Sequence, residues 1–158
     1  MVSVTVRETI RCTPDEFLGL VMDPGRYALI DAKLGPIDWV RRDGDTTDFR
    51  FASRLPGLPG PGPRVVSRMV LTPGVRVDAS YAPLPANRLV RRFSTFRASF
   101  ACTPVDGGVR VERMIELGFP SVAGRPLEAL LRRTLRPDVL REVRGAKALL
   151  EGAGHHPV

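Results

Sequence analysis

The sequence predicts an α+β protein in which a curved antiparallel sheet of about seven strands wraps around a long C-terminal helix. Short alternating runs separated by turn residues fill positions 37–119, as is typical of antiparallel strands. Residues 126–151 instead repeat apolar residues at steps of three and four, which is typical of an amphipathic helix. The length of 158 residues suits one domain, which we expect at 1–152, followed by a disordered tail at 153–158.

The N-terminal segment predicts one strand followed by two short helices. Residues 2–12 alternate between apolar and polar side chains, as a half-buried strand does. Thr13 then has the position of an N-cap, with Glu16 three residues later, which is a capping box at the start of a helix over 15–22. Asp23 starts a second short helix, and each cap is followed by proline at the first helical position.

The remaining strands follow one another along the chain. We expect them at 37–42, 47–55, 64–71, 75–81, 88–102 and 109–119. Their connections alternate between tight turns at 43–45, 73–74 and 106–108, and long proline-rich links at 56–63 and 82–87. Every second connection of an antiparallel meander lies at the same end of the sheet. Both proline-rich links are therefore expected at one end, opposite the tight turns.

The widths of the sheet and the helix predict an internal cavity. Seven strands spaced by about 4.8 Å make a sheet about 34 Å wide, whereas one helix is only about 10–12 Å across. The sheet must therefore curl around the helix, which leaves a space that opens at the proline-rich end. Residues 54–64 are predicted to form one lip of this opening. Pro137 is expected to kink the long helix or to make it restart.

Two stretches of this sequence resemble a known superfamily. The stretches are "ETIRCTPDEFLGLVMDPGRY" near the start and "RPLEALLRRTLRPDVLREVRGAKALLEG" near the end. They resemble the opening and closing segments of the START/Bet v 1-like helix-grip superfamily, also called SRPBCC, and most closely its polyketide cyclase/dehydrase and lipid-transport branch. The resemblance spans nearly the whole chain and implies the helix-grip fold. It also implies binding or transport of a hydrophobic molecule or, in a minority of members, cyclisation or dehydration.

Alternation along the strands, together with the apolar face of the last helix, gives the candidate cavity residues. They are Glu8, Trp39, Phe51, Met69, Tyr81, Phe96, Phe100, Arg113, Leu131 and Leu135. Glu8 and Arg113 are the two charges that interrupt apolar faces, and the first and last strands are neighbours in a helix-grip sheet. We therefore predict a buried Glu8–Arg113 ion pair, either purely structural or serving as a polar anchor for a ligand. Tyr81, beside residues 82–87, is the best candidate for a ligand hydrogen bond.

The composition excludes several other functions. The net charge of +7 comes mostly from arginines interleaved with acids, without stacking aromatics, which argues against nucleic acid as a partner. No apolar run approaches the ~20 residues of a membrane span, so integral membrane association is not expected. Cys12 and Cys102 make neither a disulfide framework nor a metal site, and the histidines, His155 and His156, lie in the tail. We expect a cytoplasmic monomer or homodimer without metal or cofactor.

Three functions remain open on the sequence alone. The first is binding or transport of a hydrophobic small molecule such as a lipid, polyketide or isoprenoid in the cavity. The second is a polyketide aromatase/cyclase or dehydratase that uses the same cavity; acid–base chemistry would then fall to Glu8, Arg113, Tyr81 or a water, since common catalytic motifs are missing. The third is a basic module that binds anionic lipid surfaces through arginines of the last helix.

Overall fold

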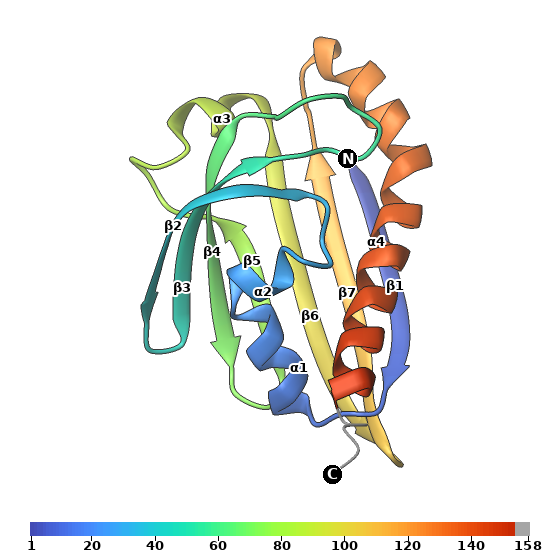
Figure 1. Ribbon diagram of the computed structural model, residues 1–158. Coiled ribbons are helices and arrows are strands. Elements are labelled where there is room, and N and C mark those ends of the chain that lie inside the picture. Colours follow the sequence, from blue (N-terminus) through green and yellow to red (C-terminus); the bar gives the residue numbers. More distant parts are fainter. Residues whose placement is uncertain (154–158) are drawn as a thin grey trace.

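The computed structural model describes residues 1–153 and contains one seven-stranded antiparallel sheet in the order β1-β7-β6-β5-β4-β3-β2. The strands are β1 (Val2–Ile10), β2 (Leu34–Asp43), β3 (Thr46–Ser53), β4 (Arg64–Thr72), β5 (Arg76–Tyr81), β6 (Thr95–Val105) and β7 (Gly108–Gly118). The sheet curves around the C-terminal helix α4 (Arg125–Ala153), as Figure 1 shows. The predicted α+β helix-grip architecture is confirmed.

The two short helices after β1 form where the capping signals predict them. They are α1 (Pro14–Val21) and α2 (Pro24–Tyr27). The backbone N–H of Glu16 donates to Thr13 Oγ1 at 3.1 Å, and the backbone N–H of Thr13 donates to Glu16 Oε1 at 3.2 Å. This reciprocal pair is the predicted capping box. The Asp23 side chain caps α2 in the same region by accepting a backbone N–H.

The prediction of one strand over 88–102 is wrong in its first part. Residues Arg88–Phe93 form the short helix α3, and β6 begins only at Thr95. Asn87 sets this change of direction: it has a left-handed backbone with φ of 61°, and its side-chain amide hydrogen-bonds both backbone groups of Val66 at 2.7 Å. Leu89 and Phe93 are four residues apart, which is helical rather than strand spacing.

Helix α4 does not restart at Pro137, so that alternative of the prediction is wrong. One helix runs from Arg125 to Ala153 with Pro137 inside it. Pro137 cannot donate to the carbonyl of Arg133, but both residues are exposed, so water can hydrate that carbonyl. Ala153 closes the helix, and the rest of the expected tail, with both histidines, lies outside the described residues.

The proline-rich links lie at the same end of the sheet, as predicted. Figure 1 shows the link 54–63, helix α3 and the start of α4 gathered at that end, opposite the tight turns. The hydrophobic core fills the space between the sheet and α4. Its most buried members include Ile10, Val77, Val109, Val111, Leu131, Leu135 and Val139. The core occupies the part of the concave face nearest the tight turns and β1, which leaves the loop end for a cavity.

Candidate functional site

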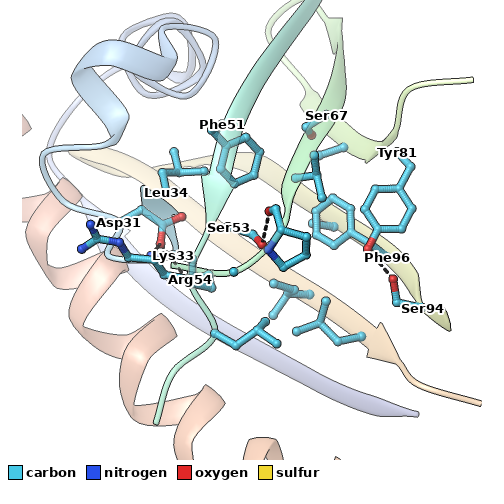
Figure 2. Close-up of a pocket in the computed structure, with 18 of the residues that line it drawn as sticks. Asp31, Lys33, Leu34, Phe51, Ser53, Arg54, Ser67, Tyr81, Ser94 and Phe96 are labelled. Carbon is cyan, nitrogen blue, oxygen red and sulfur yellow. Dashed lines mark hydrogen bonds and ion pairs between the residues drawn. The ribbon is translucent and has the colours of Figure 1, made fainter. Parts of the chain in front are cut away.

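A cavity of about 420 Å³ lies between the concave face of the sheet and the helices (Figure 2). This volume falls in the range of about 300–1,000 Å³ that is usual for small-molecule sites. Most of the wall is apolar and comes from alternate residues of β3 to β7. These wall residues are Phe49, Phe51, Val65, Met69, Ala79, Phe96, Ala98, Phe100, Ile115 and Leu117.

The link 54–63 forms one side of the cavity, as predicted for a lip. Its base is held by Ser53, whose hydroxyl donates to the carbonyl of Pro63 at 2.8 Å. Its far side is held by α4, because the Thr134 hydroxyl donates to the carbonyl of Pro56 at 2.7 Å. Gly57 packs against this contact with φ of +90°, and a Cβ there would lie 2.7 Å from Thr134 Cγ2. The lip is therefore fastened to both the sheet and the helix.

A hydrogen-bonded pair of hydroxyls lies in the wall near α3. The hydroxyl oxygens of Tyr81 and Ser94 are 2.8 Å apart, and the Ser94 hydroxyl donates its hydrogen to the carbonyl of Val90 at 2.9 Å. Tyr81 is therefore the donor to Ser94, and its own oxygen stays free to accept. Burial raises the pKa of Tyr81, so this hydroxyl remains neutral.

A network of buried charges forms the inner wall of the cavity beside α2. The ammonium of Lys33 lies 2.9 Å from Asp31 Oδ1, 2.6 Å from Asp138 Oδ2 and 2.8 Å from Glu142 Oε1. These three carboxylate oxygens lie within 4.8 Å of one another, as the ligands of a cation do. Here the cation that the three carboxylates surround is the ammonium group of Lys33.

Glu142 connects this network to the sheet. Its Oε2 accepts from Arg113 Nε at 2.8 Å and also from the Tyr27 hydroxyl. Arg113 donates a further hydrogen bond to the carbonyl of Met114 at 3.1 Å, and its guanidinium lies 4.1 Å from the ring centroid of Phe100. The arginine is thus buried with both hydrogen-bond acceptors and an aromatic face around it.

The pKa values in this network are set by burial and by the charges that neighbour each group. Three carboxylates face two buried cations, and the exposed Arg141 adds a third cation 3.8 Å from Asp138 at the edge of the network. Burial alone would raise the pKa of Glu142, but the charges of Arg113 and Lys33 outweigh it and lower this pKa to about 2. Burial and the charge of Glu142 raise the pKa of Asp31 to about 6, in spite of Lys33. Asp31, Lys33, Tyr27 and Arg113 border the cavity.

Six of the ten candidate residues from the sequence border the cavity: Phe51, Met69, Tyr81, Phe96, Phe100 and Arg113. The other four do not. Leu131 and Leu135 are fully buried in the core beneath α4. Trp39 is 37% exposed and stacks with Arg41, because irregular pairing of β2 with β3 shifts the alternation there.

The predicted ion pair between Glu8 and Arg113 is wrong. Arg113 lies opposite Val6 in the β1–β7 register, and Glu8 lies opposite Val111. Glu8 is partly exposed, and its carboxylate is 3.8 Å from the ammonium of Lys147 on α4. Arg113 finds its acceptor on the helix rather than on the neighbouring strand, because Glu142 projects onto the concave face directly above it.

Four members of the network were missed by the sequence analysis: Asp31, Lys33, Asp138 and Glu142. A signal existed for one of them. Glu142 lies seven residues after Leu135 and four before Ala146, so it interrupts the apolar stripe of α4 in the way that Arg113 interrupts its strand. Asp31 and Lys33 lie in a short link, where no periodicity marks them.

A curved antiparallel sheet that grips a long helix over an apolar cavity defines a helix-grip protein. The chain belongs to the family described as "Polyketide cyclase / dehydrase and lipid transport", whose family model matches residues 1–151. A comparison with curated proteins finds no match. Within residues 1–153, no helix combines the length and the apolar character needed to cross a bilayer.

Solved structures share this fold. The protein TTHA0849 from Thermus thermophilus has a TM-score of 0.75 at 16% identity, over 96% of this chain and 99% of that one. The Zhui aromatase/cyclase from a Streptomyces species has a TM-score of 0.75 at 11% identity, over 95% of this chain and 93% of that one. A STAR-related lipid transfer protein fragment from Xanthomonas axonopodis has a TM-score of 0.69 at 12% identity, over 94% of this chain and 85% of that one. At these identities the likeness concerns the fold alone.

Proposed function

We propose that this protein binds a hydrophobic small molecule, such as a lipid, a polyketide or an isoprenoid, in its internal cavity and acts as a carrier for it. The observation that carries this proposal is the cavity of about 420 Å³, with an apolar wall and a few polar groups at defined places. The family description, which includes lipid transport, supports it. Burial of apolar area at about 25 cal/mol per Å² would supply most of the affinity.

The polar groups suggest how such a ligand would lie. Phe51, Met69, Phe96 and Phe100 would contact its apolar body. The Tyr81 oxygen, which is free to accept, would bind a hydroxyl of the ligand near α3. Asp31, Lys33 and Arg113 would face its other end. The proposed ligand is therefore an amphipathic molecule with a polar group at one or both ends.

Native mass spectrometry of the purified protein, together with titration of the apolar probe N-phenyl-naphthylamine, tests this proposal. We expect a co-purifying small molecule, or saturable binding of one probe per chain that a long-chain fatty acid displaces. Probe binding should depend little on salt, since the probe is uncharged. Absence of saturable binding, with side chains filling the space in an experimental structure, would show that the protein is not a carrier.

Asp31 favours a second candidate function, that of a polyketide aromatase/cyclase or dehydratase. This carboxyl borders the cavity, and its pKa of about 6 lets it donate and accept a proton near neutral pH. For an enzyme, Asp31→Asn or Tyr81→Phe should lower turnover of a linear poly-β-ketone by about 10²–10⁴-fold. For a carrier, the same variants should change only the affinity. Product analysis by mass spectrometry with each variant separates these two functions.

Both cysteines fit a protein that works with reduced thiols, and we propose a cytoplasmic location. Cys12 and Cys102 are free. Burial and, to a smaller extent, the charges of Glu16 and Glu151 raise the pKa of Cys12 to about 11. Burial raises the pKa of Cys102 to about 12. Both thiols therefore stay protonated and unreactive near neutral pH. We also propose that the protein is a monomer or a homodimer.

A further inference from the structure

Large apolar side chains are exposed around the loop end of the cavity. Leu84 is 63% exposed, Leu89 67%, Phe93 58% and Val122 75%. Leu89 and Phe93 lie one turn apart on α3, so they share one face of this short helix. Val90, between them in sequence, borders the cavity instead. Helix α3 therefore presents apolar side chains both to the cavity and to the outside.

The segments around this end carry positive charge only. Residues 54–64, 82–93 and 119–127 contain six arginines and no Asp or Glu, although the chain has 17 acidic residues. Arg88 and Arg92 lie one turn apart on α3, are exposed, and form no ion pair with any described residue. Arg91 instead donates to the carbonyls of Tyr81 and Ala82 at 3.1 and 2.9 Å. It fixes α3 to the end of β5, so the helix is held in place.

We infer that this rim, formed by residues 82–93, docks the open end of the cavity onto an anionic lipid bilayer. Leu84, Leu89 and Phe93 insert among the lipids, and Arg88 and Arg92 contact the phosphates. The combination of protruding apolar side chains with adjacent arginines and no acids fits an anionic lipid surface. The inference rests on the proposed carrier function for its purpose, because docking would bring the cavity to the source of a hydrophobic ligand.

Two features favour this rim over the arginines of α4 and over a protein partner. No large apolar side chain of α4 is exposed along its described length, so α4 offers charge without insertion. Two of the α4 arginines also have partners within the chain: Arg132 with Glu128 and Arg141 with Asp138. Leu84, Leu89 and Phe93 are each more than half exposed, and such protruding side chains enter a fluid lipid surface without matching pockets.

Sedimentation with lipid vesicles tests the inference. The wild type should bind vesicles of equimolar phosphatidylcholine and phosphatidylserine, should not bind phosphatidylcholine alone, and should dissociate as salt rises. Each arginine near an anionic surface strengthens binding about fivefold, so Arg88→Gln with Arg92→Gln should weaken it roughly 25-fold. Leu89→Ser with Phe93→Ser should weaken it at least about tenfold even at low salt, because apolar insertion is lost.

The matched control removes the same charge from α4. Arg133→Gln with Arg144→Gln should leave vesicle binding within about twofold of the wild type if the rim is the docking surface. An equal loss of vesicle binding in this control would overturn the inference. Failure of the wild type to bind phosphatidylserine vesicles at low salt would also overturn it. Binding to an acidic protein without binding to vesicles would also overturn it and would assign the rim to a protein partner.

Probe titration on the same proteins separates docking from ligand binding. The exposed side chains of Leu89 and Phe93 do not border the cavity, so the rim variants should keep the probe affinity of the wild type. Vesicle binding without any probe binding would refute the carrier function and leave docking standing. Probe binding without vesicle binding would refute docking alone. Circular dichroism checks that each variant is folded.

Discussion

The guanidinium of Arg113 on β7 pairs with the carboxylate of Glu142 on α4, with Nε and Oε2 2.8 Å apart and both side chains almost fully buried. This contact crosses the core from sheet to helix. Lys33 reaches the other oxygen of the same carboxylate at 2.8 Å. One buried glutamate thus joins the sheet, the link after α2 and the long helix beside the inner wall of the cavity.

Removal of either partner should destabilise the fold strongly. Arg113→Met or Glu142→Leu leaves a buried charge without its counterpart, which costs about 3–5 kcal/mol. The double variant Arg113→Met with Glu142→Leu should cost less than the sum of the two single changes, because it removes both charges together. Urea unfolding of the three variants and the wild type measures these free energies.

Glu8→Gln is the control for this prediction. Its carboxylate is partly exposed and 3.8 Å from Lys147, so the change should stay within about 0.5 kcal/mol. Small and additive effects at Arg113 and Glu142 would contradict a coupled buried network.

The architecture could be predicted from the sequence because each part of it has a local signal. Alternation marks the strands, Thr13 and Glu16 mark the start of α1, and the two kinds of link mark the two ends of the sheet. Arg113 was also recognisable as a charge on a buried face. Each of these signals can be recognised from a residue and its neighbours in the sequence.

The partner of Arg113 could not be predicted in this way. Its choice depends on how α4 is rotated over the sheet, and that rotation is fixed by packing of the whole core rather than by local spacing. The same limit applies to Trp39, because a single irregularity in strand pairing reverses the face of every later residue. Helix α3 was missed because the backbone of Asn87 turns the chain.

Probe binding should be lost when a charge is placed in the cavity wall. Met69 is buried and borders the cavity, whereas Val70, next to it on β4, is 43% exposed on the other face. Met69→Glu should weaken binding of the apolar probe by at least about 10-fold, since a carboxylate in an apolar wall is costly. Val70→Glu adds the same charge and should leave probe affinity unchanged. Fluorescence titration measures both, and equal affinities would place the probe outside the cavity.

The fastening of the lip should control how quickly a ligand enters and leaves. Thr134→Val keeps the methyl group beside Gly57 but removes the hydrogen bond to the carbonyl of Pro56. We expect the on-rate and the off-rate of the probe to rise together, with an affinity change smaller than either rate change. The cost in unfolding free energy should be about 1 kcal/mol.

Thr134→Ser is the matched variant, because it keeps the hydroxyl and loses the methyl group. Its probe kinetics in stopped-flow fluorescence should stay close to those of the wild type. Unchanged rates in Thr134→Val would mean that the link 54–63 does not limit access to the cavity.

The stability of the protein should fall as pH rises from about 4 to 6, and Asp31 is the reason. Burial and the charge of Glu142 raise the pKa of Asp31 in the folded state from 3.8 to about 6. The folded protein therefore holds this proton more tightly than the unfolded chain, so deprotonation between these values favours unfolding by roughly 3 kcal/mol. Glu142 acts in the opposite direction at lower pH, because its folded pKa of about 2 makes stability rise up to about pH 4.5.

Asp31→Asn isolates the contribution of Asp31. The amide resembles the protonated acid and cannot ionise, so the variant should match the wild type near pH 4 and exceed its stability by roughly 3 kcal/mol near pH 7. The rise due to Glu142 below pH 4.5 should persist in both proteins. Urea unfolding at a series of pH values gives the two curves. If they run parallel from pH 4 to pH 7, Asp31 ionises as an ordinary surface carboxyl does, and neither burial nor the charge of Glu142 raises its pKa.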